Sequence, residues 1–208
     1  MFQHFFQFRM KKQIKEKMIQ YSFLPCKYLE ALHTECLTTI SADKVTIWGL
    51  EAERLQEELG RLLGKGRVNT DVKVEKYKLF ERINYVLKRI RVFHQYLIDY
   101  AVQLPEANYK LFVGLVEAVS YVARLFFQGM TAFYEEYDQA LMELDQLENQ
   151  YEETIEKIND FKYPTSNSQK KWDPTAPKEI LGTSLRDIVQ AILLAGEKVS
   201  HMINAFNY

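Results

Sequence analysis

Apolar residues recur every three or four positions along most of the chain, which is the spacing of one face of an α-helix. The clearest example lies between positions 76 and 100, where the apolar positions are Tyr77, Phe80, Ile83, Val86, Leu87, Ile90, Phe93, Leu97 and Tyr100. The same spacing predicts six helices, over residues 12–37, 42–63, 76–100, 105–126, 131–158 and 178–205. Only 8 glycines and 5 prolines interrupt the 208 residues, which is too few for a strand-rich fold.

Proline and glycine mark where these helices begin, bend and end. Pro105 breaks the chain and suits the first turn of the helix that follows it. Gly129 is expected to end or bend that helix, after which Thr131 can cap the next one. The stretch 163–177 contains three of the five prolines and is predicted to be a loop. Inside the first helix, Pro25 predicts an irregularity, because proline lacks a backbone donor.

The chain contains two related halves. The acidic helical stretch 141–158 has a weaker twin at 49–63, and a Leu-Glu pair occurs in each, Leu50-Glu51 in the earlier stretch and Leu147-Glu148 in the later one. Each stretch is followed, after a polar break, by a long helix. We therefore expect an all-α fold, a six-helix elongated bundle with helices running nearly side by side. Its expected parts are a basic aromatic segment at 1–22 and a bundle over 23–208, made of three-helix units at about 23–104 and 105–206.

The composition is that of an ordinary globular protein, with 47 % apolar residues, 26 % charged residues and a net charge of −1. No basic stripe with interleaved aromatic residues follows any predicted helix, so nucleic acid is not an expected partner. The chain has no GxSxG motif, no phosphate-binding glycine loop and no recognisable pairing of Cys with His. An enzyme is therefore not expected.

The cysteines and two of the histidines have structural explanations. Cys26 and Cys36 are ten residues apart on one predicted helix, which separates them by about 15 Å along its axis, too far for a disulfide. We expect two buried thiols in a reducing cytoplasm. His94 and His201 are each expected to be packed in the fold or to lie on its surface.

The N-terminal segment is apolar first and basic afterwards. Phe5 and Phe6 stand among four phenylalanines, which are followed by Arg9, Lys11, Lys12, Lys15 and Lys17. A secretory signal has the reverse order, so export is not expected. The segment either lies on an anionic membrane or a partner, or packs its rings on the bundle and leaves its lysines in solvent. No run of 18 apolar residues occurs, so no membrane-spanning helix is expected. The predicted location is cytoplasmic, or peripheral on the inner face of the membrane.

Three glutamates are candidate metal ligands: Glu51, Glu148 and Glu152. The last two are four residues apart and share one helix face, as in carboxylate metal bundles. Carboxylate oxygens suit hard cations or iron. A di-iron site would also need ExxH pairs, which none of the four histidines provides. The alternative is a solvated acidic face.

The predicted helix 131–158 is strongly acidic, because it carries nine Asp and Glu residues against the single Lys157. Like charges on one helix repel, so a bound cation or basic side chains should compensate them. The candidates on the predicted helix 76–100 are Arg82, Lys88, Arg89 and Arg91.

This arrangement resembles the PhoU-like phosphate-transport regulators, specifically the shorter family often encoded beside PiT-type inorganic phosphate permeases. Each three-helix unit of that family has an LExxxD helix followed by a helix with a DDxxD motif. The counterparts here are Leu50-Glu51 leading to Leu55, and Leu147-Glu148 leading to Glu152. The helices that follow in the family are matched by residues 79–90 and 185–203, and Trp172-Asp173-Pro174 stands where the family has a polar connector. The resemblance covers residues 28–206.

The resemblance implies an acidic cluster that binds metal ions, iron among them in some relatives. Where the family has aspartates, this chain has Leu55, Asn84, Tyr85, Lys88, Leu194 and Lys198. The carboxylates that remain are Glu51, Glu148, Glu152 and Glu197. An ammonium such as that of Lys88 would repel a divalent cation. We therefore expect a diverged member that has lost most or all of its metal site and binds no cofactor.

The function that the resemblance implies is that of a non-catalytic regulator or adaptor. Its expected partner is a PiT-type phosphate permease or another membrane transport protein. One alternative is a metal-binding helical carboxylate protein that uses the four remaining glutamates. Another is a structural helical module that forms a homodimer through its aromatic surface.

Overall fold

The computed structural model describes residues 2–40, 43–65, 70–163 and 176–206, and within these ranges the chain is all-helical. Side chains are described at all of these positions except 2–8, 43–46, 65, 70–71 and 206. The helices are α1 Phe2–Leu37, α2 Asp43–Lys65, α3 Thr70–Tyr100, the 3-10 turn η1 Ala101–Gln103, α4 Glu106–Ala132, α5 Tyr137–Lys162 and α6 Pro177–Phe206. The prediction of an all-α chain with six long helices is therefore confirmed for the described residues.

Proline sets two of the helix starts as predicted. Leu104 has an extended backbone with ψ of 135°, because a residue before proline is held out of the helical region. Pro105 then accepts the first helical hydrogen bond of α4 from the Tyr109 amide at 2.9 Å. At the other end of the second half, α6 begins at Pro177, where the missing N–H of proline costs no hydrogen bond.

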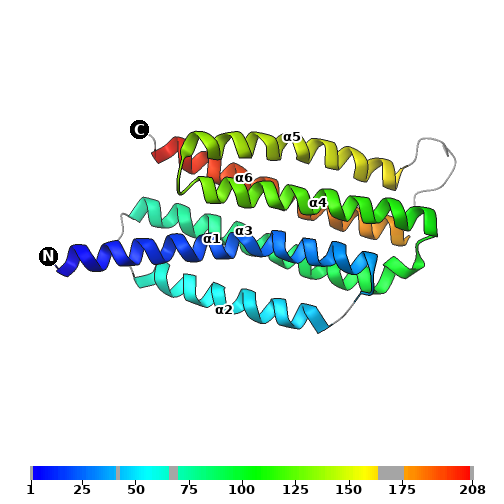
Figure 1. Ribbon diagram of the computed structural model, residues 1–208, viewed down its shortest axis with the longest axis horizontal. Coiled ribbons are helices and arrows are strands. Elements are labelled where there is room, and N and C mark those ends of the chain that lie inside the picture. The colour runs from blue at the N-terminus through cyan, green and yellow to red at the C-terminus, as the bar shows by residue number, and fades with distance from the viewer. Residues whose placement is uncertain (1, 41–42, 66–69, 164–175, 207–208) are drawn as a thin grey trace.

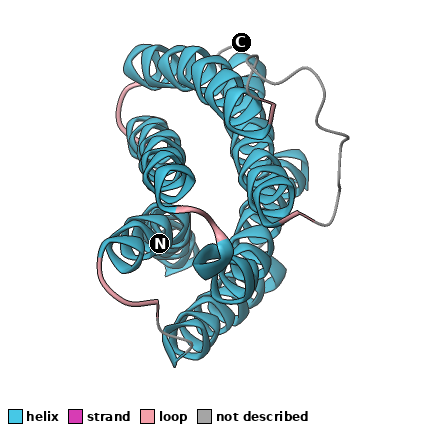
Figure 2. Cartoon of the chain, turned by 90° about the vertical axis from the view of Figure 1, so that its right-hand side faces the viewer, coloured by secondary structure: helices cyan, strands magenta, loops and turns pink. Residues whose placement is uncertain are grey.

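Four helices form the centre of the bundle and two lie outside it. α1 lies along α4 and α3 lies along α6, while α1 also contacts α3 and α4 contacts α6. α2 packs on α1 and α3 from one side, and α5 packs on α4 and α6 from the opposite side (Figure 1). Consecutive helices run in opposite directions, and the view along the bundle in Figure 2 shows them nearly parallel to one axis.

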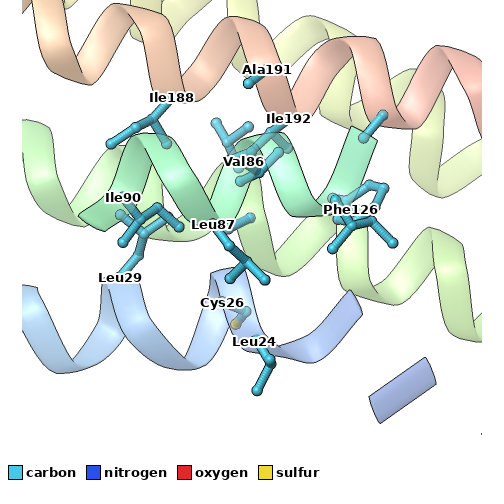
Figure 3. Close-up of a cluster of buried hydrophobic side chains, with 14 of the residues drawn as sticks. Leu24, Cys26, Leu29, Val86, Leu87, Ile90, Phe126, Ile188, Ala191 and Ile192 are labelled. Carbon is cyan, nitrogen blue, oxygen red and sulfur yellow. The ribbon is translucent and has the colours of Figure 1, made fainter. Parts of the chain in front are cut away.

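The core is apolar and runs the length of the central helices. Figure 3 shows one layer of it, in which side chains of α1, α3, α4 and α6 meet. Its labelled residues are Leu24, Cys26, Leu29, Val86, Leu87, Ile90, Phe126, Ile188, Ala191 and Ile192, all of them buried. The expected aromatic contribution is present, since Tyr21, Phe93, Phe112 and Phe126 are among the largest fully buried side chains.

The first helix is longer than predicted. α1 begins at Phe2 rather than near residue 12, and it continues through Pro25 without interruption. The reason is that Met10, Ile14 and Met18 are buried on the same side as the rest of the helix. The backbone is therefore continuous across the boundary that we expected between residues 22 and 23.

The boundary between the fourth and fifth helices also differs from the prediction. Gly129 does not end α4, which continues to Ala132. Thr131 caps no helix, because its hydroxyl donates to the Phe127 carbonyl at 3.0 Å and α5 begins only at Tyr137. Gly129 instead permits close packing, since a Cβ there would lie 3.0 Å from the Leu144 side chain of α5.

Among the described residues, one helix is long and apolar enough to cross a membrane by length and composition, namely α4 with a mean hydropathy of 1.5 over its most apolar window. We expected no such helix from the sequence, because no uninterrupted run of 18 apolar residues occurs; α4 reaches this hydropathy on average, with a few polar residues in the window. Half of that window is buried inside the fold, and exposed Glu117, Arg124 and Gln128 line the outer side of the helix. The composition of α4 is therefore explained by its central place in the bundle.

Candidate functional site

Glu51, the first candidate ligand, joins α2 to α1. The Lys27 amine donates to both of its carboxylate oxygens, at 2.8 and 2.7 Å. The Tyr28 hydroxyl lies 3.4 Å from one of these oxygens and donates to the Trp48 carbonyl at 2.8 Å. Burial, and then the charge of Glu51, raise the pKa of Tyr28. The contacts of Glu51 are those of a residue that attaches one helix to another.

The other three candidate ligands lie elsewhere. Glu148 and Glu152 are exposed on α5, and Glu197 is exposed on α6. Glu51 stands on α2, across the bundle from α5 (Figure 1). Within the described part of the chain, no three His, Cys, Asp or Glu side chains gather in a way that could hold a metal ion. The fold therefore does not bring the four glutamates into one site.

The expected compensation of the acidic helix by α3 is wrong. α3 packs on α1, α2 and α6, and Arg89 pairs with Asp187 of α6 at 3.4 Å. Ion pairs of α5 include Lys157 with Glu153, at 3.9 Å, and Lys162 with Glu179 of α6, at 3.6 Å. Exposed carboxylates cover the rest of the outer face of α5, which matches the alternative of a solvated acidic surface.

The two Leu-Glu pairs are not equivalent in packing. Leu147 is 1 % exposed and packs in the core, whereas Leu50 is 64 % exposed. On α2 the buried side chains are instead Ala52, Leu55, Leu59 and Leu63. The two Leu-Glu pairs are identical in sequence, but their leucines do not occupy equivalent positions in the fold.

The predicted contact segment is partly described. The side chains of Phe5 and Phe6 lie outside the described residues, as does the connector Trp172-Asp173-Pro174. Arg9, Lys11 and Lys12 are exposed on α1. Lys15 is half-buried and donates to the Tyr134 carbonyl at 3.1 Å, so it links α1 to the connection between α4 and α5.

Glu35 on α1 and His94 on α3 form a buried pair of ionisable residues, which was not predicted from the sequence. Each side chain is 1 % exposed, and the His94 Nε2 atom lies 3.4 Å from Glu35 Oε2. The Trp48 ring of α2 lies 5.8 Å from the His94 ring. His94 was expected to be either packed or on the surface; it is packed, and its partner Glu35 was not predicted. The sequence feature that could have indicated this pair is the position of Glu35, three residues after Leu32 and therefore on the buried face of α1.

The pair has no access to a substrate. The cavity beside it, between Tyr28, Trp48, Arg91 and His94, has a volume of about 20 Å³, which is room for about one water molecule. The pair therefore joins α1 and α3 in the interior.

Three larger pockets open on the surface of the described residues. One, of about 580 Å³, lies beside the ion pair of Arg124 and Glu30, in which the guanidinium donates at 3.1 and 2.6 Å. A second, of about 490 Å³, lies between α1 and α2 beside Lys17 and Glu58. The third, of about 590 Å³, is lined by Val72, Lys76, Phe133, Tyr134, Glu135 and Tyr137, and is called the turn pocket below.

Both cysteines are free and buried, as predicted. Burial raises the pKa of the Cys26 thiol to about 11 and that of the Cys36 thiol to about 12, with Glu30 and Glu35 as the next causes. A thiol with so high a pKa is a poor nucleophile at neutral pH. Neither cysteine has the properties of a reactive residue.

The fold and these side chains define the class of the protein as an all-α helical bundle. Comparison with models of known protein families and with curated proteins gave no match.

Proposed function

We propose that the protein is a non-catalytic regulator or adaptor, resembling the PhoU-like proteins, that acts on inorganic phosphate transport by docking on a PiT-type permease or another membrane transport protein. The observation that supports the proposal is the matching order of the helices in the bundle. α1 and α3 are central and α2 is their outer helix, just as α4 and α6 are central and α5 is their outer helix, while α1 with α4 and α3 with α6 join the two sets closely. This matching arrangement supports descent from a repeated three-helix unit.

The exposed cations of α1 support a contact with an acidic surface. Arg9, Lys11 and Lys12 all face solvent near the start of the helix. Basic residues near an anionic membrane surface each contribute about 1 kcal/mol of attraction. The segment can therefore hold the bundle beside a membrane protein while the rest of the chain contacts the permease.

Co-purification with a tagged PiT-type permease from membranes tests the proposal. The wild-type protein is expected to remain with the permease, and deletion of its gene is expected to change phosphate uptake. Reversal of the three charges (Arg9→Glu, Lys11→Glu, Lys12→Glu) should reduce the recovered protein at least about tenfold, since three contributions of about 1 kcal/mol are lost.

A matched control reverses three exposed cations away from this segment: Arg82→Glu, Lys88→Glu and Arg186→Glu. This variant changes the net charge equally and should still co-purify. If the wild-type protein does not associate with membranes that contain the permease, and its deletion leaves phosphate uptake unchanged, the proposed function is wrong.

A second candidate function, that of a module that forms homodimers, is favoured by exposed apolar side chains on α3, which alternate there with the exposed Lys78, Glu81 and Lys88. Val74, Tyr77, Tyr85 and Val92 are between 42 and 51 % exposed. Three of them, Val74, Tyr85 and Val92, follow one another at intervals of 11 and 7 residues, which keeps them on one helix face. A dimeric mass in analytical ultracentrifugation that Tyr85→Glu with Val92→Glu converts to a monomer would support this function. A monomeric wild-type protein at micromolar concentration would exclude it.

A further inference from the structure

The turn pocket has the volume of a small-molecule site and is about half open to solvent. Its volume of about 590 Å³ falls within the range of about 300–1,000 Å³ that is usual for ligand pockets. It lies where the first turns of α3 meet the connection between α4 and α5. Nothing in the proposed adaptor function uses it.

One wall of the pocket is aromatic. The Phe133 ring lies 4.9 Å from the Tyr134 ring in an edge-to-face contact, and 6.0 Å from the Tyr137 ring. The backbone beneath these rings is fixed, because the amides of Phe133 and Glu135 donate to the carbonyls of Gly129 and Ala132 at 2.8 Å each. The wall is therefore preformed, and Tyr137 and the half-buried Tyr134 are its accessible rings, because Phe133 is buried beneath them.

The charge of the pocket comes from Lys76. This half-buried lysine forms no ion pair among the described residues, and its amine lies 5.8 Å from the centre of the Tyr134 ring. The adjacent Glu75 does not neutralise it, because Glu75 pairs with Lys198 and with Lys78. Burial, and then the charge of Lys11, lower the pKa of Lys76. A half-buried ammonium without a counter-charge is costly, and a bound anion would remove that cost.

Two further lysines lie near Lys76. Lys15 approaches the same ring, with its amine also 5.8 Å from the centre of Tyr134, and Lys11 is near enough to affect Lys76. The acid that lines the pocket is Glu135, whose side chain is exposed. Solvent screens an exposed carboxylate more strongly than the half-buried cations.

We propose that the turn pocket binds an amphiphilic anion, whose carboxylate, sulfonate or phosphate group pairs with Lys76 and whose aromatic or aliphatic body packs on Tyr134 and Tyr137. The ligand comes either from the pool of small molecules or from the headgroup region of a membrane lipid, which share this chemistry. The inference does not depend on association with a permease.

Isothermal titration calorimetry of the full-length protein with 1-naphthyl phosphate tests the site, because this probe joins a phosphate group to an aromatic body. Lys76→Gln should weaken binding at least about tenfold, as expected for loss of a charge-assisted contact. Lys76→Arg, which keeps the charge, should bind within about threefold of the wild type. Tyr137→Ala, on a 41 % exposed wall residue, should weaken binding several-fold.

Two controls separate this site from general effects. Lys88→Gln removes an exposed lysine of the same helix and should leave binding unchanged. Inorganic phosphate and 1-naphthol, which are the two halves of the probe, should each bind more weakly than the whole. The thermal melt of each variant, followed by circular dichroism, verifies that the fold persists.

A competition experiment, in which vesicles or soluble anions displace the bound probe, identifies the source of the ligand. Vesicles of phosphatidylcholine with phosphatidylglycerol displace the probe if the ligand is a lipid, while vesicles of phosphatidylcholine alone do not. Displacement by soluble aryl or alkyl anions without displacement by vesicles identifies a small molecule, and either result supports the site. Unchanged binding of the probe to folded Lys76→Gln protein, or no binding to the wild type, overturns the proposal.

Discussion

The group α1–α3 and the group α4–α6 hold their outer helices by different contacts. α5 packs on both α4 and α6 through a buried row: Ala140, Leu144, Leu147, Thr154, Ile158 and Phe161. Glycines bring the helices close, since a Cβ at Gly129 would lie 3.0 Å from Leu144 and one at Gly196 would lie 3.4 Å from Leu147. The outer helix of the second group is thereby part of the apolar core.

α2 packs less extensively on α1 and α3 than α5 does on α4 and α6, and polar contacts supplement its packing. Its own buried row is Ala52, Leu55, Leu59 and Leu63. Lys27 and Lys17 of α1 pair with Glu51 and Glu58 of α2, at 2.7 and 2.6 Å, and the Tyr28 ring stacks on Trp48 at 4.9 Å. The interior of this group is also more polar, because it contains the buried pair of Glu35 and His94 and the buried Asn84. The groups α1–α3 and α4–α6 thus have similar helix arrangements that are stabilised by different kinds of contact.

One of the two largest effects is expected from Glu35→Ala, which removes one member of the buried pair. Removing one partner of a buried polar pair costs about 1–3 kcal/mol, and more where the remaining group is charged, because that group stays in the interior without its partner. Denaturation with urea measures the free energy of unfolding. Glu53→Ala, on an exposed residue of α2, is the control and should change it by less than about 0.5 kcal/mol. A loss below about 1 kcal/mol for Glu35→Ala would contradict a stabilising role for the pair.

The other of the two largest effects is expected from Leu144→Ala. Leu144 is 5 % exposed and lies in the close contact of α5 with Gly129. Truncation of a buried leucine costs about 2–5 kcal/mol, and we expect about 3 because the rigid glycine contact limits collapse of the cavity. Met142→Ala, on a 64 % exposed neighbour, should be nearly neutral in the same urea experiment. Equal effects of the two variants would show that α5 is not packed as described.

The thiols of α1 are expected to react slowly and to make stability sensitive to alkali. The pKa of Cys26 is raised from 9.0 to about 11, so its thiolate fraction near neutral pH falls about a hundredfold. Labelling with a disulfide reagent should be slow for the folded protein and rapid after unfolding in guanidinium chloride. The pKa values of the two thiols are higher in the folded than in the unfolded protein. The contribution of the protonated thiols to the free energy of unfolding is therefore fully present below pH 9.0, and it is lost as the pH rises toward about 11 for Cys26 and about 12 for Cys36. Rapid labelling of the native protein would refute their burial.

The smallest effect is expected from Lys27→Ala. Its ion pair with Glu51 is partly exposed, with side-chain exposures of 42 and 28 %. Such a pair contributes less than about 1 kcal/mol and weakens as salt is added. Urea denaturation at low and high ionic strength measures both properties. A loss of more than about 2 kcal/mol, independent of salt, would mean that α2 is held more firmly than its contacts indicate.

The sequence predicts the helices better than their ends and their contacts. Apolar spacing and prolines such as Pro105 and Pro177 suffice for most elements, because these signals are local. The turn after Ala132 carries neither glycine nor proline, and hydrogen bonds from Glu135 and Glu136 to Ala132 form it. We instead expected residues 2–11 to form part of a separate basic aromatic segment, although Phe2, Phe5 and Phe6 have the i, i+3, i+4 spacing of a helix.

The candidate site was predicted less well than the fold. Glu51 of α2 contacts Lys27 and Tyr28, which lie on α1. Such pairing between helices depends on how the helices pack against each other. The same reason hid the contact of Glu35 with His94. The turn pocket combines Lys76 with residues more than 50 positions away, and no local pattern indicates such a meeting.

Native-state hydrogen exchange tests the central comparison most directly, because it measures the free energy of opening for each helix. We predict that the amides of α2 exchange through a local opening of lower free energy, while those of α5 exchange only with the central helices. Elements that move on binding come from the least stable parts of a protein, so α2 is also the helix that a partner is expected to displace. Equal protection of α2 and α5, or earlier exchange of α5, would contradict the account.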